Sequence, residues 1–509
     1  MTAVDGEAEP RTLVIVGGGT AGWMTAAMTA RFLERGWRIY LIESDAIGTV
    51  GVGEATIPQI GLFNAALGID EDQFVRETGA TFKLAIEFVD WVRPGHRYMH
   101  AFGQVGRGLG LIGFHHYWLR ARAAGRAAMF GDYALNDRAG RADRFARQVP
   151  GQGGVVPPMP YAFHLDAGLY AAFLRRYAEA RGVVRTEGKV IGVERAANGD
   201  IAAVRLEGER RVAGDVFVDC TGFRALLLGD ALGTGFEDWS EWLPCDRALA
   251  VPSAHGSGAL TPYTRATARR AGWQWRIPLQ HRVGNGYVYA SHHISDDAAA
   301  ATLLAHLDGA PLTDPRPLRF TAGKQRAFFV RNCVGIGLAS GFVEPLESTS
   351  IHLIQTGIAR LLELLPNGPV TEAARAEYNR RAHLEYDRIR DFLVLHYHAN
   401  QRVGEPLWDE ARTMDLPPEL ARKIALWRAT ATVSRVDEEL FAEPGWLQVL
   451  IGQEILPERW HPLTDQVEAN DLDAFLNAVA TMAARTAAAL PRHADTVARI
   501  AGAARSNAA

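Results

Sequence analysis

The sequence predicts an α/β (mixed α+β) fold built on a Rossmann-like dinucleotide-binding unit and followed by a mainly helical region. A short apolar strand at residues 12–16 leads into the glycine turn GGGTAG and then into an Ala- and Met-rich helix that ends near residue 33. A second strand at residues 37–42 ends in Glu43 and completes a βαβ unit. After residue 353 the apolar periodicity becomes helical, and the tail is rich in alanine.

Composition and charge restrict the class of protein. The chain has 509 residues, of which 48% are hydrophobic and 22% charged, which excludes a mainly disordered or fibrous protein. A net charge of −4 offers no bulk positive field to nucleic acid. The N-terminus lacks a basic n-region, and no apolar run approaches the roughly 18 residues that span a bilayer. We therefore expect a cytoplasmic protein with no membrane or nucleic-acid partner.

No residue set suggests a disulfide framework or a metal site. The cysteines Cys220, Cys245 and Cys333 lie far apart, without CxxC spacing. His115 and His116 are adjacent, and adjacent side chains point in different directions on a helix or a strand. We therefore predict buried thiols and no metal ligands.

The glycine turn has the GxGxxG spacing in a strand–turn–helix context. Gly17 permits the tight turn, Gly19 lets the backbone approach a pyrophosphate, and Gly22 lets the helix pack on the strand. The helix N-terminus offers free N–H groups to phosphates, and Glu43 can accept hydrogen bonds from ribose hydroxyls. The alternative is a glycine-rich structural turn. The predicted dinucleotide contacts here are Gly17, Gly19, Thr20, Ala21, Gly22 and Glu43.

Two later segments favour FAD over NAD. Asp219 lies in the segment VFVDCTG (residues 216–222), which follows the strand-to-loop pattern of two-dinucleotide-fold flavoproteins, although an ordinary strand end would also fit. The segment GIGLASG (335–341), with Gly337 and Leu338, is spaced one residue too widely for a second nucleotide loop. We expect it to pack near the flavin, and we find no separate NAD motif. Further strands are predicted around 189–205 and at 216–220 and 328–336.

Four motifs in order resemble the flavin-dependent halogenases of the tryptophan-halogenase type. They are GGGTAGW (17–23), GVGEATIP (51–58), WQWRIP (273–278) and GFVEPLEST (341–349), within about residues 11–460. The resemblance implies an FAD-binding flavoprotein-monooxygenase fold. It also implies a reaction in which reduced FAD and oxygen form a flavin hydroperoxide that converts chloride or bromide to hypohalous acid, which then halogenates an electron-rich, indole-like aromatic substrate. A separate NAD(P)H-dependent flavin reductase would supply the reduced FAD.

The resemblance also implies a domain organisation. Residues 9–365 would form the FAD-binding and halide/substrate module, with nucleotide-binding pieces at about 9–90, 155–235 and 320–365 and substrate-side insertions between them. Residues 366–509 would form a mainly helical region that caps the substrate pocket. The sequence leaves the oligomeric state open, a homodimer included.

Lys83 and Glu347 match the catalytic residues of this family. The ammonium of Lys83 would engage the hypohalous acid as a hydrogen-bond donor or as a chloramine, and desolvation would lower its pKa. A lysine in a helical segment is ordinarily solvated, but the neighbours Phe82 and Leu84 argue against a solvated face here. Glu347 would take the proton from the cationic arenium intermediate. Glu344, three residues earlier, is the alternative carboxylate.

The resemblance also implies which residues bind the halide and the substrate. Thr349 and Ser350 would bind halide through backbone N–H groups at the start of a helix over 351–364. The well-known tryptophan halogenases have glycine at the position of Ser350, which leaves the preference between chloride and bromide open. Ala55 would join the FAD contacts. The residues expected to stack on or line the aromatic substrate are His100, Phe102, Trp273, Trp275 and Trp446.

Further sequence features bear on the choice of substrate and on two alternative functions. The paired tyrosines that hold the amino-acid backbone in free-tryptophan halogenases are missing from residues 441–447, which favours indole or larger derivatives over free tryptophan. An FAD-dependent aromatic hydroxylase would usually carry a Gly-Asp motif where this chain has Gly337-Leu338. A non-catalytic FAD-binding protein would have no use for Lys83 and Glu347.

Overall fold

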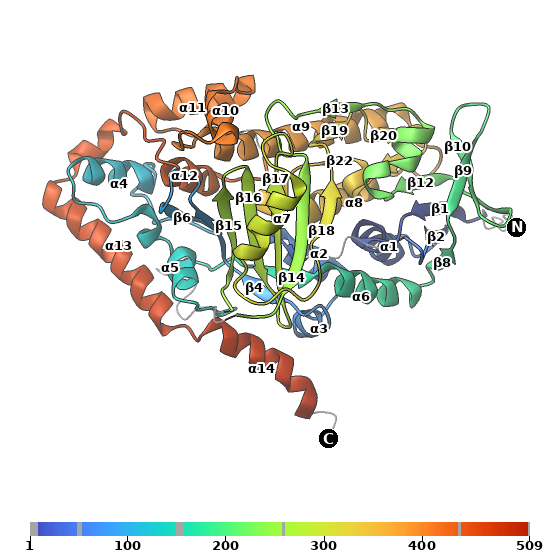
Figure 1. The fold of residues 1–509 in the computed structure, drawn as a ribbon, viewed down its shortest axis with the longest axis horizontal. Coiled ribbons are helices and arrows are strands. Elements are labelled where there is room, and N and C mark those ends of the chain that lie inside the picture. Colours follow the sequence, from blue (N-terminus) through green and yellow to red (C-terminus); the bar gives the residue numbers. More distant parts are fainter. Residues whose placement is uncertain (1–8, 48–52, 149–156, 257–259, 436–438, 507–509) are drawn as a thin grey trace, which may run out of the picture.

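A six-stranded, mainly parallel sheet carries the glycine turn at the end of its strand β1. The computed structural model describes residues 9–47, 53–148, 157–256, 260–435 and 439–506 (Figure 1). Five strands of the sheet run parallel, and β20 pairs antiparallel at one edge. In spatial order the strands are β20 (Phe329–Val330), β21 (Cys333–Gly335), β12 (Val216–Asp219), β1 (Arg11–Val16), β2 (Trp37–Glu43) and β8 (Val184–Glu187).

The expected βαβ unit is present at the centre of this sheet. Helix α1 (Thr20–Phe32) begins directly after the glycine turn, and α6 (Ala167–Glu179) packs against it. One expectation was wrong, because residues 328–336 do not form a single strand. Arg331 adopts a left-handed conformation with φ of 56°, so the chain reverses there and β20 pairs with β21 as a hairpin.

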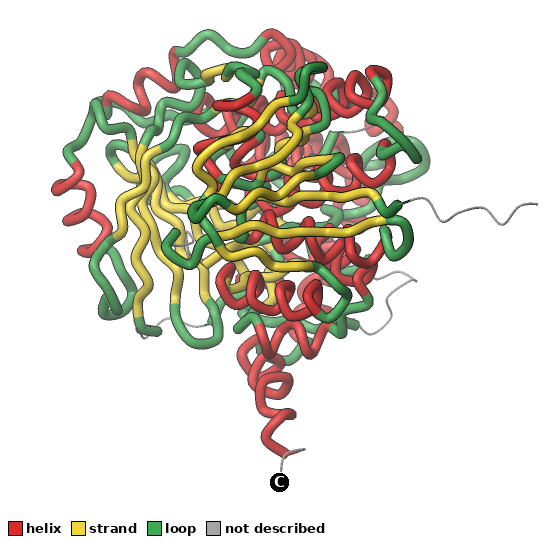
Figure 2. The backbone as a smooth tube through the Cα atoms, turned by 90° about the vertical axis from the view of Figure 1, so that its right-hand side faces the viewer, coloured by secondary structure: helices red, strands yellow, loops and turns green. Residues whose placement is uncertain are grey.

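A second, seven-stranded sheet lies beside the first and carries the aromatic motif WQWRIP on β16 (Figure 2). Helix α7 (Asp296–Ala305) packs on β14 and β17. The strands of the seven-stranded sheet are, in spatial order, β18 (Arg316–Arg319), β14 (Arg247–Ser253), β17 (Val283–Tyr289), β16 (Gly272–Pro278), β15 (Tyr263–Arg269), β5 (Ala85–Val89) and β6 (Arg97–Ala101).

Three small sheets complete the strand structure. One of them brings Lys83 to the end of a strand, which excludes the solvated helix face considered as the alternative for this lysine. The strand Thr81–Lys83 pairs antiparallel with residues 162–164. The small sheets are β3 (Gly53–Ala55), β7 (Ala162–Asp166) and β4 (Thr81–Lys83); β11 (Arg210–Ala213), β10 (Ile201–Leu206) and β9 (Val190–Arg195); and β13 (Phe236–Asp238), β19 (Gly323–Gln325) and β22 (Gly341–Phe342).

Helices dominate after residue 349, as expected. In Figure 1, α9, α10 and α11 lie across the top, and α13 lies along the left side, away from β1 and β2. Helix α14 projects from the body of the protein toward the C-terminus (Figure 2). These helices are α8 (Ser350–Leu364), α9 (Glu372–His398), α10 (Pro406–Thr413), α11 (Pro418–Thr430), α12 (Glu443–Gly452), α13 (Ala469–Ala489) and α14 (His493–Ser506). Before them come α2 (Gln59–Leu67), α3 (Glu71–Glu77), α4 (Phe114–Ala123) and α5 (Leu135–Arg141).

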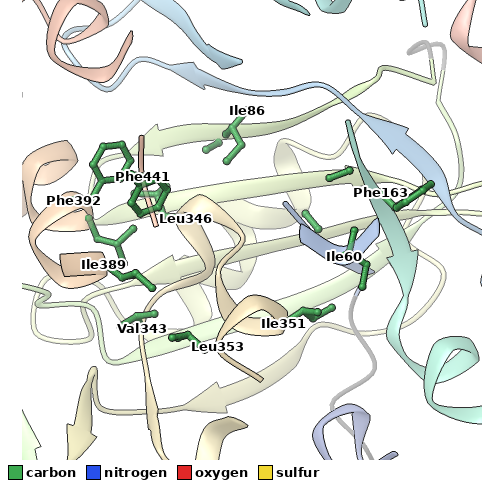
Figure 3. Close-up of a cluster of buried hydrophobic side chains, with 14 of the residues drawn as sticks. Ile60, Ile86, Phe163, Val343, Leu346, Ile351, Leu353, Ile389, Phe392 and Phe441 are labelled. Carbon is green, nitrogen blue, oxygen red and sulfur yellow. The ribbon is translucent and has the colours of Figure 1, made fainter. Parts of the chain in front are cut away.

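One hydrophobic core joins the strand-rich part to the C-terminal helices. It extends from Leu13 on β1 to Ile500 on α14. Figure 3 shows Phe392 of α9 and Phe441 side by side, close to Leu346 of the GFVEPLEST motif. The rings of Phe392 and Phe441 are stacked with their centroids 3.9 Å apart. Because this core is shared, α9 and α12 are fixed against the motif that carries Glu347. None of the described helices combines the length and apolar character that a membrane span requires.

Candidate active site

A cavity of about 580 Å³ lies where β1, β2 and β12 end. Ligands of open α/β sheets bind at this edge, beyond the carboxyl ends of the strands. Of the ten residues predicted to contact a dinucleotide, all but Gly22 and Asp219 line this cavity. Those that do are Gly17, Gly19, Thr20, Ala21, Glu43, Ala55, Gly337 and Leu338.

Each glycine of the turn has the environment that its expected role requires. A Cβ on Gly17, whose φ is +113°, would lie 2.2 Å from the Cys220 carbonyl oxygen, so the turn is tight against β12. A Cβ on Gly22 would lie 1.8 Å from the Gly17 carbonyl oxygen, so helix α1 packs directly on the turn. Around Gly19, in contrast, no heavy atom lies within 4 Å of the built Cβ. Gly19 therefore exposes its backbone to open space at the α1 N-terminus.

Asp219 holds the backbone together and does not line the cavity. The carboxylate is fully buried and accepts hydrogen bonds from the backbone and hydroxyl of Thr221 and from the backbone N–H groups of Leu227 and Leu228. These contacts fix the chain after β12, where Thr221 and Gly222 face the cavity in its place. The predicted loop therefore reaches the cavity, but through Thr221 and Gly222, whereas Asp219 supports the loop from behind.

Two carboxylates line the cavity, and their environments differ. Glu43 accepts hydrogen bonds from Arg185 Nε at 2.5 Å and from Trp23 Nε1 at 3.3 Å, which orient it at the end of β2. Glu54 on β3 was not predicted from the sequence. Burial raises the pKa of Glu54 to about 7.

Trp273 and Trp275 lie in the wall of this same cavity. Both side chains are buried on β16, and Trp273 Nε1 donates a hydrogen bond to Glu344 at 2.8 Å. We expected both side chains at the aromatic substrate. In the structure they line the same cavity as the residues of the glycine turn.

Lys83 is buried next to the cavity. Its Nζ donates hydrogen bonds to the Thr56 carbonyl at 3.0 Å and to Ser348 Oγ at 2.8 Å, and it lies 5.2 Å from the centroid of the Phe102 ring. Burial lowers the pKa of Lys83 to about 7, against an opposing effect of the nearby Glu347 charge. Since Ser348 lines the cavity, Lys83 lies one hydrogen bond away from it.

Ser348 was not predicted as a site residue, although it stands between two residues that were. Its φ of 60° places it in the left-handed region, which is uncommon for a residue with a side chain. This conformation ends the short turn Pro345–Glu347 and directs the chain into α8. Such backbone strain is frequent at functional sites.

Glu347 is buried between two histidines from distant parts of the chain. His100 Nδ1, on β6, lies 2.8 Å from one carboxylate oxygen, and His396 Nε2, on α9, lies 2.8 Å from the other. Burial alone would raise the pKa of Glu347, but the charges and hydrogen bonds of His100 and His396 outweigh it and lower the pKa to about 2. Glu347 is therefore ionised at neutral pH.

Glu344 faces a different part of the structure. Its Oε2 accepts hydrogen bonds from Tyr397 at 2.6 Å and from Trp273, and burial raises its pKa to about 7. Glu347 contacts His100 and acts on the charge of Lys83, while Glu344 anchors the cavity wall. This geometry favours Glu347 as the carboxylate that acts together with Lys83.

Thr349 and Ser350 lie at the N-terminus of α8, which begins at Ser350. Ser350 lines the cavity, and Thr349 is fully buried beside it. Thr349 makes no side-chain cap bond, and its hydroxyl has no hydrogen-bond partner within the part of the chain that the structure describes. An uncapped helix N-terminus at a cavity is suited to an anion.

The chain is similar to known proteins over most of its length. A model of the tryptophan halogenase family matches residues 12–469. The chain belongs to this family. It is 38% identical over 440 residues to the tryptophan 6-halogenase of Streptomyces toxytricini, a match that covers 82% of this chain and 84% of that one.

Solved structures of flavin-dependent halogenases have the same fold. One from Xanthomonas campestris is 49% identical with a TM-score of 0.93, covering 97% of this chain and 99% of that one. Another, from Brevundimonas, is 44% identical, also with a TM-score of 0.93 and the same coverage. Family membership implies that the chain is an enzyme that uses FAD and a halide, and that members typically depend on a separate flavin reductase.

The aromatic residues expected at the substrate divide into two groups in this halogenase. His100 and Phe102 lie beside Glu347 and Lys83, at the end of β6. Trp446 on α12 is buried edge-on against Phe392, with ring centroids 4.8 Å apart, and so lies behind the Phe392–Phe441 stack. His100, Phe102 and Trp446 are absent from the lining of the 580 Å³ cavity. The Lys83–Ser348 contact therefore separates a cofactor-sized space from the group around His100.

The expectation about His115 and His116 was wrong in its geometry. Both rings are buried on α4 with centroids 4.1 Å apart, so they do point the same way. Each imidazole forms a hydrogen bond with the backbone: His115 with the Ala431 carbonyl, and His116 with the His461 N–H. Among the described residues, the one group of metal-binding side chains within reach of one another is His292, His293 and Glu410.

Two glycine substitutions should separate folding from cofactor binding. We expect Gly22→Ala to lower the free energy of unfolding by roughly 2–4 kcal/mol, because its Cβ meets the backbone of Gly17. Gly19→Ala should leave the melting temperature of the ligand-free protein unchanged and weaken FAD binding about tenfold or more. Thermal melting and fluorescence titration with FAD measure the two effects. Equal losses of stability in both variants would contradict these roles.

Lys83 should make stability depend on pH in a specific direction. Its pKa is about 7 in the folded protein, against about 10.4 in an unfolded chain, so the unfolded state binds the extra proton between these values. Below pH 7 the folded state bears the full free-energy cost of burying the ammonium. This cost decreases as the pH rises toward 10. We therefore expect Lys83→Met to be more stable than wild type at pH 6 and to have lost more than half of this advantage by pH 9. Urea unfolding measures it, with exposed Lys189→Met as the control; a difference that does not vary with pH would contradict the burial argument.

Proposed function

We propose that this chain attaches chloride or bromide to an electron-rich, indole-like aromatic ring, using reduced FAD delivered by a separate NAD(P)H-dependent reductase. The observation that carries the proposal is the buried Lys83. Its Nζ bonds to Ser348 in the wall of the cofactor-sized cavity, and its charge interacts with Glu347, which contacts His100. A cationic donor between a cavity and an aromatic-rich group is suited to guiding hypohalous acid from one to the other.

The cavity residues fit FAD. The open space at Gly19 and the uncapped start of α1 would hold the pyrophosphate, and Glu43 would accept hydrogen bonds from the ribose hydroxyls. Trp273, Trp275 and the Gly337-Leu338 turn would line the flavin end. Bound reduced FAD, together with oxygen, supplies the oxidising equivalent that converts halide to hypohalous acid.

The N-terminus of α8 would bind the halide. Free backbone N–H groups near Thr349 and Ser350 and the positive end of the helix dipole attract an anion without a full positive charge. The buried Thr349 hydroxyl could add one more donor. Because the contacts come mainly from the backbone, serine in place of the glycine at position 350 should preserve halide binding.

Lys83 and Glu347 would act on successive steps. Lys83 would receive hypohalous acid, as a hydrogen-bond donor in its ammonium form or as a nucleophile in its neutral form, and a pKa near 7 makes both forms accessible. The ring would then attack the halogen. From the hydrogen-bonded acid, the oxygen–halogen bond breaks and the oxygen takes the Lys83 proton and leaves as water; from the haloamine, which forms with loss of water, the nitrogen–halogen bond breaks and its electron pair returns to Lys83, which takes up a proton. Glu347, ionised beside the ring, would stabilise the resulting cation and accept the proton from the halogenated carbon, whose C–H electron pair restores aromaticity.

A direct assay tests the proposal. We expect purified protein with FAD, flavin reductase, NADH and bromide to convert indoles or phenols to products with the bromine isotope pattern in mass spectrometry. Lys83→Ala should abolish the product and keep FAD affinity nearly intact, because Lys83 lies outside the cavity lining. Hydroxylated products would instead support an aromatic hydroxylase, and fast NADH oxidation without added reductase would contradict the dependence on a separate enzyme.

The two buried glutamates should differ in their effect on turnover. We expect Glu347→Gln to lower kcat by roughly 10²-fold or more, because the positioned base and its charge are lost. Glu344→Gln is the matched control, since its amide can still accept from Tyr397 and Trp273, and it should change kcat by less than about tenfold. Steady-state kinetics at saturating indole measure both. If Glu344→Gln lowered kcat more than Glu347→Gln, Glu344 would be the base and Glu347 the structural residue.

Free tryptophan should be a poorer substrate than indole. The segment that would meet the amino-acid group presents Phe441, stacked on Phe392, and Gly445, whose Cβ would lie 3.0 Å from His100 Nε2. An ammonium and a carboxylate placed against these groups would lose hydration without equivalent partners. The test is to measure kcat/KM for tryptophan and for indole with the same supply of reduced flavin. A ratio that strongly favours tryptophan would refute this specificity.

A further inference from the structure

His396 is a buried titratable residue that the sequence did not single out. It lies in the last turn of α9, its side chain has no exposed surface, and it is 49 residues from Glu347 in the chain. Both of its ring nitrogens face oxygen atoms. Nδ1 lies 2.8 Å from the Phe392 carbonyl, and Nε2 lies 2.8 Å from Glu347 Oε1.

These two contacts determine where the protons are. A carbonyl oxygen cannot donate, so Nδ1 must carry a hydrogen and donate it to Phe392. In a neutral ring Nε2 would then present its lone pair to the carboxylate oxygen, and two lone pairs at 2.8 Å repel each other. The approach is favourable only when Nε2 also carries a proton, which makes the ring an imidazolium. Nε2 makes no hydrogen bond among the described residues, so its contact with the Glu347 carboxylate is an attraction between opposite charges.

The surroundings favour the proton on His396 and the negative charge on Glu347. His100 Nδ1 approaches both carboxylate oxygens, and Lys83 adds a second positive field from β4. Tyr98 on β6 also faces this charge, and its buried hydroxyl has no hydrogen-bond partner among the described residues. The rings of Phe88, Trp91 and Phe392 surround His396 and exclude water. In such a dry environment an unpaired charge would be costly, so the pair is stable only as a unit.

We propose that His396 is a positioning residue, held as an imidazolium whose Nε2 proton keeps Glu347 ionised and fixed toward the ring-binding side. This inference rests on the proposed function, because it specifies how Glu347 stays available as the base. It also assigns a role to α9: the C-terminal helical region contributes a charge to the site as well as covering it.

The proposal predicts a pH effect with a definite sign. Removing the imidazolium weakens the stabilisation of the Glu347 carboxylate, so the carboxylate becomes protonated at a higher pH and the acidic limb of the kcat profile moves upward. We expect His396→Phe to lower kcat at pH 6 at least tenfold and to recover most of it at pH 8.5, with KM for indole changed less than about twofold. His396→Gln, which supplies an N–H donor without a charge, should lie between His396→Phe and wild type.

His398→Gln is the control for these variants. It makes the same chemical change two residues along α9, where the imidazole is associated with the Ala411 backbone. It should leave the pH profile unchanged. A His396→Phe profile that falls equally at all pH values would show a purely structural role and would overturn the proposal.

A second measurement does not depend on catalysis. In protein labelled with ¹⁵N-histidine, we expect one imidazole to remain protonated on both nitrogens at pH 8, to disappear in His396→Gln, and to lose its Nε2 proton in Glu347→Gln. A neutral His396 with hydrogen on Nδ1 alone would overturn the proposal. If the protein failed to halogenate any substrate and the doubly protonated ring were present, the proposed function would fail while the proton assignment would stand.

Discussion

The burial of one ammonium group is the constraint on which the rest of this site depends. Lys83 has no exposed surface, and a charged amine in that position must be compensated by nearby dipoles and charges. Thr56 and Ser348 supply oxygen acceptors from two different motifs, and Glu347 supplies the opposing charge. The strained backbone of Ser348 is explained by this requirement, since its hydroxyl must face Lys83 while the chain turns into α8.

The same constraint links the two halves of the chain. Glu347 compensates Lys83, and its own burial is compensated by His100 from the seven-stranded sheet and His396 from the C-terminal helices. The shared hydrophobic core around Phe392 and Phe441 holds these elements together (Figure 3). Such a group of buried charges tolerates little displacement, because a shifted side chain would leave a buried charge without its partner.

Ser348 stands between the cavity and the aromatic residues near Glu347, and the site residues divide according to the side of Ser348 on which they lie. Trp273 and Trp275 close the cofactor-sized cavity, and Glu344 anchors Trp273 from behind. His100 and Phe102 lie beyond Lys83. In the proposed reaction this arrangement would keep the aromatic ring away from the flavin, and a small diffusible oxidant would connect the two. Glu344 and Glu347, three residues apart, can therefore serve different purposes in one short motif.

The sequence by itself predicted the βαβ unit and the family, and both are confirmed, because each depends on a local pattern of residues. The same local patterns singled out the glycine turn, Lys83 and Glu347, whose roles in cofactor binding and catalysis stay predictions. The tertiary structure decided the contacts that depend on distant elements. It showed that Lys83 ends a strand, that Asp219 supports a loop, that Trp273 and Trp275 line the cavity, and that His115 and His116 face the same way. His396 had no signal at all in the sequence. A histidine in a long amphipathic helix is identical in pattern whether it faces solvent or a carboxylate, and only the packing of α9 against the GFVEPLEST motif places its imidazole against Glu347.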